Sequence, residues 1–265
     1  MTSVPTRPIP VPAFDPTRPE AVAMADPRSG ALSRSLVATL GVAGATMAAA
    51  DGLNPQYNPL SEVASRYVNG TAGWLITVAL LCIGTASAVL AGWLGRLPEL
   101  GRAGRVGRWA LTLWAVGVFV AGVFPADPPG QWSRPSTSEL VHGMAAWLSF
   151  AAFPVAAVLL TRAVTRGGTR PAVVVPGRLR SGLVGLVIAS VMSTIGLAVF
   201  LVDVMGGPSL GFGGVPTFVG LVERLVIVAN LAWLALAAVM LGGMMRNGAG
   251  RPEVSRAQGG TDAPA

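Results

Sequence analysis

The sequence predicts an all-α polytopic membrane protein, a bundle of six transmembrane helices with both termini in the cytoplasm. Three observations predict this class. Only 12% of the 265 residues are charged and 52% are apolar, whereas about 25% of the residues in a soluble domain are charged. Six apolar runs approach the ~20 residues that a helix needs to cross a bilayer. Most arginines lie in segments that alternate along the chain with these runs.

The first three expected helices cover residues 32–50, 71–95 and 107–124. The first and third runs are rich in Gly, Ala and Thr, which favours packing against other helices over contact with lipid. Pro125 ends the third run, because proline cannot continue the helical hydrogen-bond ladder. All three runs are continuously apolar, without the alternation that strands of a membrane barrel would show.

The last three expected helices cover residues 140–161, 181–204 and 218–245. Ser136, Thr137 or Ser138 can cap the fourth, with Glu139 in its first turn favoured by the helix dipole. The six runs form one transmembrane domain over residues 31–246. The Pro-rich residues 1–30 and the polar residues 247–265 are expected to be disordered cytoplasmic tails.

The distribution of arginine predicts how the bundle is oriented. Sixteen arginines lie on the side of the two tails and of the second and fourth loops, whereas the other side holds Arg66, Arg134 and Arg224. An excess of basic residues marks the cytoplasmic side. We therefore expect a multi-pass protein of the cell membrane with cytoplasmic N- and C-termini. We assign its arginines to topology and contact with membrane lipids, and we expect no nucleic acid as a partner.

The loops on the expected outer side gather most of the unusual chemistry. Their carboxylates exceed their arginines by three. These carboxylates are Asp51, Glu62, Asp127, Glu139, Asp203 and Glu223. His142 and Cys82 are the sole histidine and cysteine, which excludes an intramolecular disulfide and sites built from several histidines or cysteines. We expect no cofactor and no metal.

His142 and the charges near the helix ends each allow a structural and a functional interpretation. Glu139 and His142 share a helix face at the spacing of di-iron bundles, but a single histidine makes that chemistry a poor fit. We favour a His142 hydrogen-bonded to Glu139, Asp127 or a neighbouring helix end. Likewise, Arg224 is expected to pair with Asp203 or Asp127 across helices. The alternative is a polar pocket between helices that opens outward.

Three stretches resemble a bacterial family of integral membrane proteins, the domain of unknown function 998. They are NPLSEVASRYVNGTAGW from Asn58, then FPADP from Phe124 followed by ELVHGMAAW from Glu139, and GLVERLVIVANLAW from Gly220. The resemblance extends over roughly residues 35–245 and implies the six-helix layout. It implies no activity and no catalytic residues.

Three functions remain open at this stage. We favour a non-enzymatic membrane protein that is a lipid-interacting, sensory or assembly factor, because no catalytic motif is present. The alternative is a membrane-embedded enzyme that acts on a lipid or isoprenoid through acid–base groups on the outer face. Its candidate residues are Asp127, His142, Glu139, Asp203, Glu223, Arg224 and Asp51. A small transporter is the third hypothesis, disfavoured by the lack of charges at mid-membrane.

Overall fold

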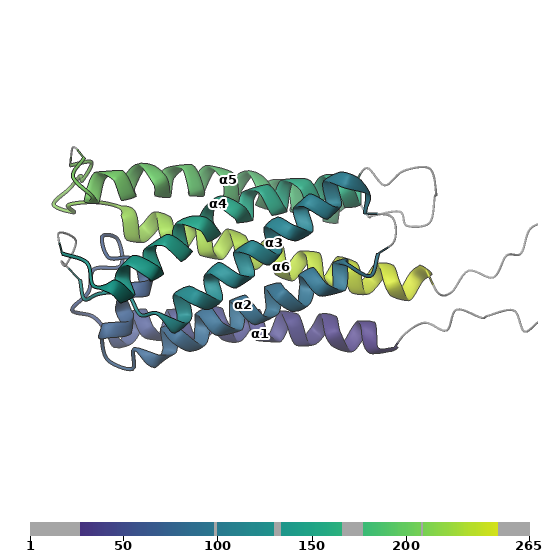
Figure 1. Ribbon diagram of the computed structural model, residues 1–265, viewed down its shortest axis with the longest axis horizontal. Coiled ribbons are helices and arrows are strands. Elements are labelled where there is room, and N and C mark those ends of the chain that lie inside the picture. Colours follow the sequence, from purple (N-terminus) through teal and green to yellow (C-terminus); the bar gives the residue numbers. More distant parts are fainter. Residues whose placement is uncertain (1–26, 98–99, 130–133, 166–176, 208, 249–265) are drawn as a thin grey trace, which may run out of the picture.

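The protein is a bundle of six long helices, seen here in a computed structural model that describes residues 27–97, 100–129, 134–165, 177–207 and 209–248 (Figure 1). The helices are α1 (Pro27–Leu53), α2 (Trp74–Leu94), α3 (Gly101–Val123), α4 (Thr137–Thr165), α5 (Gly177–Val204) and α6 (Val219–Gly248). A 3₁₀ helix, η1 (Ala64–Asn69), lies between α1 and α2. All six long helices are apolar enough to span a membrane. The expected all-α fold class is confirmed.

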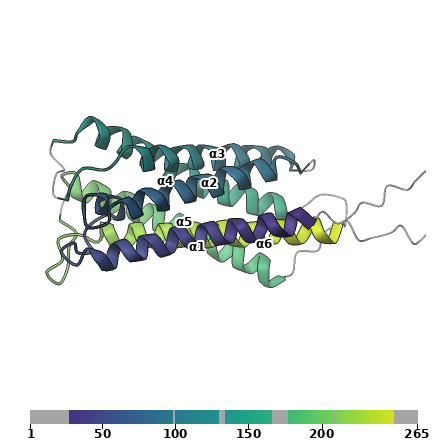
Figure 2. The ribbon, with the colours of Figure 1, turned by 90° about the horizontal axis from the view of Figure 1, so that it is seen from below.

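The two ends of the bundle differ in character. The connections after α1, α3 and α5, together with η1, lie at one end, which we call the loop end (left in Figures 1 and 2). α1 begins and α6 ends at the opposite end, which we call the terminal end. All seven candidate residues lie toward the loop end, because each belongs to one of these connections or to a helix turn beside it.

Several helices extend beyond the apolar runs from which they were expected. α1 begins at Pro27 and α3 at Gly101, because polar and arginine-bearing turns continue a helix beyond the membrane. Residues 27–30 and 247–248 are therefore helical, although they belong to the segments 1–30 and 247–265 that were expected to be disordered. The remaining parts of the expected tails lie outside the described residues.

The helices pack as a ring in which the contact between α4 and α5 is the weakest between neighbours. Neighbours along the chain pack side by side from α1 to α4, α5 packs on α6, and α6 returns to α1. α4 contacts α5 much less than it contacts α3. Three aromatic rings fill the centre, with Phe153 lying 4.8 Å from Trp114 and 5.7 Å from Trp233 between ring centroids. The weak contact between α4 and α5 leaves the side of the bundle open there.

Small residues allow α3 to approach α4 closely, as the composition of the third run predicts. A Cβ added to Gly117 would lie 2.8 Å from the carbonyl oxygen of Ala145, and one added to Gly107 would lie 2.9 Å from the Leu160 side chain. Since lipid is as apolar as leucine, such helices associate through close van der Waals packing. In α1 the pattern holds only in part, because Gly41 and Gly52 face open space.

Candidate functional site

A closed set of hydrogen bonds joins the turn after α3 to the first turn of α4. The backbone N–H of Ser136 donates to Asp127 Oδ2 (2.7 Å), and that of Glu139 donates to Ser136 Oγ (3.1 Å). The N–H of Asp127 in turn donates to Glu139 Oε2 (2.7 Å). Ser136 is therefore the N-cap of α4. The bonds from Ser136 hold the pKa of the Asp127 carboxyl below its usual value, so that this carboxylate is ionised at neutral pH.

Arg66 of η1 fastens this turn to the loop between α1 and α2. Its side chain is 1% exposed; Nη1 donates to the carbonyl oxygen of Pro128 (3.0 Å), and Nη2 donates to Glu139 Oε1 (3.4 Å). The amide of Asn69 adds a bond to the carbonyl oxygen of Ala126 (2.9 Å). Both carboxylate oxygens of Glu139 are thus occupied, one by Arg66 and one by the backbone of Asp127.

His142 lies one turn after Glu139 and closes the end of α3. Its Nδ1 lies 2.9 Å from the carbonyl oxygens of both Ala121 and Phe124. Carbonyl groups at a helix end lack intrahelical partners, and since they only accept hydrogen bonds, Nδ1 carries the proton. In the neutral ring, Nε2 therefore holds a lone pair. Of the partners expected for His142, the neighbouring helix end is the observed one.

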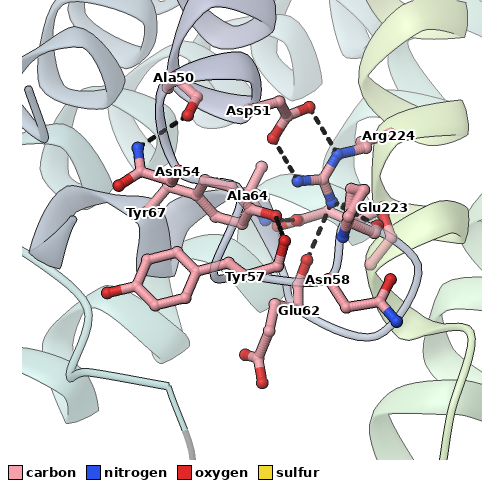
Figure 3. Close-up of polar contacts among 12 residues, drawn as sticks. Ala50, Asp51, Asn54, Tyr57, Asn58, Glu62, Ala64, Tyr67, Glu223 and Arg224 are labelled. Atoms are coloured by element: carbon pink, nitrogen blue, oxygen red, sulfur yellow. Dashed lines mark hydrogen bonds and ion pairs between the residues drawn. The ribbon is translucent and has the colours of Figure 1, made fainter. Parts of the chain in front are cut away.

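Glu223 is a buried carboxylate near the start of α6. It is 6% exposed, and its Oε2 accepts a hydrogen bond from the backbone N–H of Ala64 at the start of η1 (Figure 3). In the described part of the chain its Oε1 has no hydrogen-bond partner, and no basic side chain forms an ion pair with it. The carboxylate therefore fixes η1 against α6 and keeps one acceptor available.

Arg224 locks α6 to α1 and to the loop between α1 and α2. Its guanidinium binds Asp51 in a bidentate pair, with Nε 2.9 Å from Oδ2 and Nη2 2.5 Å from Oδ1 (Figure 3). It also lies over the ring of Tyr67, 5.1 Å from its centroid. The remaining nitrogen, Nη1, donates to the carbonyl oxygens of Pro59, Glu62 and Gly220. These contacts satisfy Arg224 within the protein and indicate a structural role.

The partners expected for Arg224 were wrong. It binds Asp51 rather than Asp203 or Asp127, because η1 and its flanking loop lie between α1 and α6 and supply the carbonyl groups that orient the guanidinium. Asp203 instead accepts a bond from the backbone N–H of Leu210 (3.1 Å). It lines a polar pocket of about 280 Å³ with Glu62, whose pKa burial raises.

A second pocket opens between α4 and α5, and we call it the α4–α5 pocket. Its volume is about 270 Å³, and its polar end is formed by Arg66, Glu139, His142 and Glu223. The other lining side chains are mainly apolar. They include Leu140, Met144, Trp147, Phe150, Leu197, Leu201 and Met205. Met144 is 73% exposed and Met205 68% exposed, so the pocket opens on the outer surface of the bundle.

A smaller pocket continues from it into the bundle. This inner pocket, of about 50 Å³, shares Ser65, His142, Ala146, Phe150 and Glu223 with the α4–α5 pocket. The remaining lining residues are largely apolar side chains of α1, α2, α3 and α6. His142 and Glu223 therefore lie where an outer cavity narrows into the interior of the bundle.

The structure divides the seven candidate residues into two groups. Glu139, His142 and Glu223 line the α4–α5 pocket. The others do not line it: Asp127 supports the turn behind Glu139, Asp51 and Arg224 form an ion pair, and Asp203 lies at the polar pocket. Arg66 and the apolar lining of α5 were not among the candidates. One signal could have identified Arg66, the position of this arginine within the apolar segment VASRYV.

No three His, Cys, Asp or Glu side chains converge within the part of the chain that the structure describes. The chemistry of the α4–α5 pocket is instead that of an amphipathic cavity. It combines a few fixed polar groups at one end with an apolar wall, which is the usual composition of a site for a small organic ligand.

Comparison with known proteins gives one match. A family model described as "Protein of unknown function (DUF998)" matches residues 36–240, which include every residue that lines the α4–α5 pocket. No curated protein and no solved structure matches this chain.

Proposed function

This chain belongs to the family of proteins of unknown function DUF998, and from that premise we propose that it binds a lipid-like amphipathic molecule in the α4–α5 pocket. One observation carries the proposal: the pocket has four ionisable side chains at one end and an apolar wall that opens between two membrane-spanning helices. A lipid matches this division, since its polar head and its chains need different surroundings.

The lateral opening provides a route for such a ligand. α4 and α5 contact each other little, and the exposed rim residues Leu140, Met144 and Met205 extend the apolar wall toward the membrane. A lipid entering there keeps its chains among lipids while its head reaches the ionisable side chains of the pocket. Six membrane-spanning helices in any case place the protein in contact with lipid.

We also propose that the loop end faces the non-cytoplasmic side of the cell membrane. The support is the excess of arginine in the tails and in the second and fourth loops, since basic residues in short loops mark the cytoplasmic side. The ligand would then be a lipid of the outer leaflet.

Filling the pocket tests lipid binding. A Cβ added to Gly143, which lines the pocket on α4, meets no atom within 4 Å, so we expect the side chain of Gly143→Leu to extend into the cavity. Native mass spectrometry of the detergent-purified protein should show a retained lipid that this variant loses. Gly185→Leu on the exposed face of α5 is the matched control, since Gly185 also has open space around it. Equal retention by all three proteins would contradict the proposal.

A second candidate function is acid–base chemistry on the bound lipid. It is favoured by His142, whose Nδ1 donates to backbone carbonyls and whose Nε2 is left as a base at the pocket beside Glu223. Incubation of the purified protein with a labelled lipid extract, followed by chromatography, tests this alternative. A product formed by wild type and absent with His142→Gln would support it, and unchanged lipids would reject it.

A further inference from the structure

The polar end of the α4–α5 pocket offers hydrogen-bond acceptors to a ligand. Glu139 already accepts a hydrogen bond at each carboxylate oxygen, from Arg66 and from the backbone of Asp127. His142 uses Nδ1 as a donor to the end of α3, so the neutral ring has an acceptor at Nε2. Glu223 uses only Oε2. Nε2 of His142 and Oε1 of Glu223 therefore remain as acceptors that no described residue uses.

The charge of Glu223 determines which kind of hydrogen-bond donor suits the polar end of the α4–α5 pocket. Glu223 is 6% exposed, and among the described residues it is bound by a backbone N–H rather than by a cation. The neighbouring cations are engaged elsewhere, Arg66 with Glu139 and Arg224 with Asp51. An ionised carboxylate buried without an opposite charge is unfavourable, and a cation supplied by the ligand would relieve this.

Apart from Arg66, which pairs with Glu139, the surrounding side chains fit a small cation better than an anion. Trp147 and Phe150 line the same pocket as the two acceptors, and aromatic faces attract ammonium groups. A phosphate at the same depth would meet the carboxylates of Glu139 and Glu223. The volume of about 270 Å³ suits a compact head with the start of its chains.

We propose that the α4–α5 pocket selects a lipid whose headgroup ends in a protonated primary amine, bound by Glu223 Oε1 and His142 Nε2. This inference rests on the proposed function and adds the class of headgroup to it. The ammonium group donates two of its three hydrogen bonds to these acceptors and neutralises Glu223. The chains lie along the apolar wall formed by α4 and α5.

Native mass spectrometry with defined lipids tests the headgroup directly. The delipidated full-length protein is titrated with phosphatidylethanolamine, its N-acetyl derivative, phosphatidylglycerol and diacylglycerol, all with the same chains. We expect phosphatidylethanolamine to bind at least about tenfold more tightly than each of the others. A tenfold difference in affinity corresponds to about 1.4 kcal/mol. The N-acetyl derivative removes the charge of the amine without any change to the protein.

Two variants assign that preference to Glu223. Glu223→Gln keeps an oxygen that can accept from Ala64 but removes the charge, and it should reduce the preference to about twofold or less. Asp203→Asn is the matched control, because Asp203 is equally buried and lines the other polar pocket. It should leave the preference unchanged.

The outcomes separate this inference from the proposed function. Equal binding of all four lipids, or preference for an uncharged or anionic head, overturns the amine proposal even when Gly143→Leu still abolishes binding. Binding that Gly143→Leu does not change overturns the pocket itself. Should Glu223→Gln fail to fold, the comparison of phosphatidylethanolamine with its N-acetyl derivative in the wild-type protein still decides the matter.

Discussion

Asp127 supports the loop end as an ion, and its charge makes the stability of this region depend on pH. The hydrogen bonds from Ser136 lower the pKa of Asp127 in the folded protein below the ordinary value of 3.8. The stabilisation is therefore fully present above the unfolded pKa and is lost as the pH falls through the lower folded value. We expect the melting temperature of wild type to fall more steeply below pH 4 than that of Asp127→Asn. Parallel pH slopes would contradict this role.

Arg224 is the residue whose loss we expect to weaken the loop end most. Arg224→Gln leaves Asp51 without its cation and removes the donor to three carbonyl oxygens. Because the pair is partly exposed, we expect a loss of about 1–3 kcal/mol rather than the larger value of a fully buried pair. Thermal unfolding in detergent measures it. Arg134→Gln, at an exposed position, should change stability by no more than about 0.5 kcal/mol.

Sequence reasoning at the level of single residues succeeded where local rules decide. Ser136 is one of the three caps expected for α4, and the end of α3 is one of the three partners expected for His142. The partner of Arg224 depends instead on how α1, α6 and η1 meet, which no spacing along the chain encodes. Arg66 was overlooked for the same reason, since its burial is created by the fold.

At the scale of elements, the contact between α3 and α4 depends on glycine. A Cβ at Gly117 would lie 2.8 Å from the carbonyl oxygen of Ala145 and would also meet the hydroxyl of Ser149. Because the backbone atom cannot rotate away, we expect Gly117→Ala to destabilise the bundle by about 1–3 kcal/mol. Gly92→Ala on α2, where nothing lies within 4 Å, is the control. Equal melting temperatures for the two variants would contradict the prediction that the contact between α3 and α4 depends on Gly117.

The number and type of the helices could be predicted from the sequence, because a continuous apolar run must form a helix in a bilayer. Which helices pack against each other could not be predicted from the sequence. All six runs are apolar around most of their circumference, so no amphipathic face indicates which helix packs on which. The weak contact between α4 and α5, and with it the pocket, depends on this pairing.

At the scale of the whole molecule, the proposed orientation makes a prediction about accessibility. Cys82 is the sole cysteine, so a Cys82→Ser protein accepts single cysteines at chosen sites. Arg134→Cys lies at the loop end and Arg102→Cys toward the terminal end, both at exposed positions. A membrane-impermeant maleimide added to intact cells should label the first and not the second. The reverse pattern would invert the protein and move the pocket to the cytoplasmic leaflet.

The account depends most on a lipid entering between α4 and α5, and photo-crosslinking measures this directly. A phosphatidylethanolamine with a photoreactive group near its head is incorporated with the protein into bilayer discs, and the crosslinked peptides are mapped. We predict crosslinks concentrated on residues 139–150 and 197–205, reduced severalfold by Gly143→Leu and unchanged by Gly185→Leu. Crosslinks spread evenly over the lipid-facing surfaces of all six helices, and unaffected by Gly143→Leu, would contradict the account.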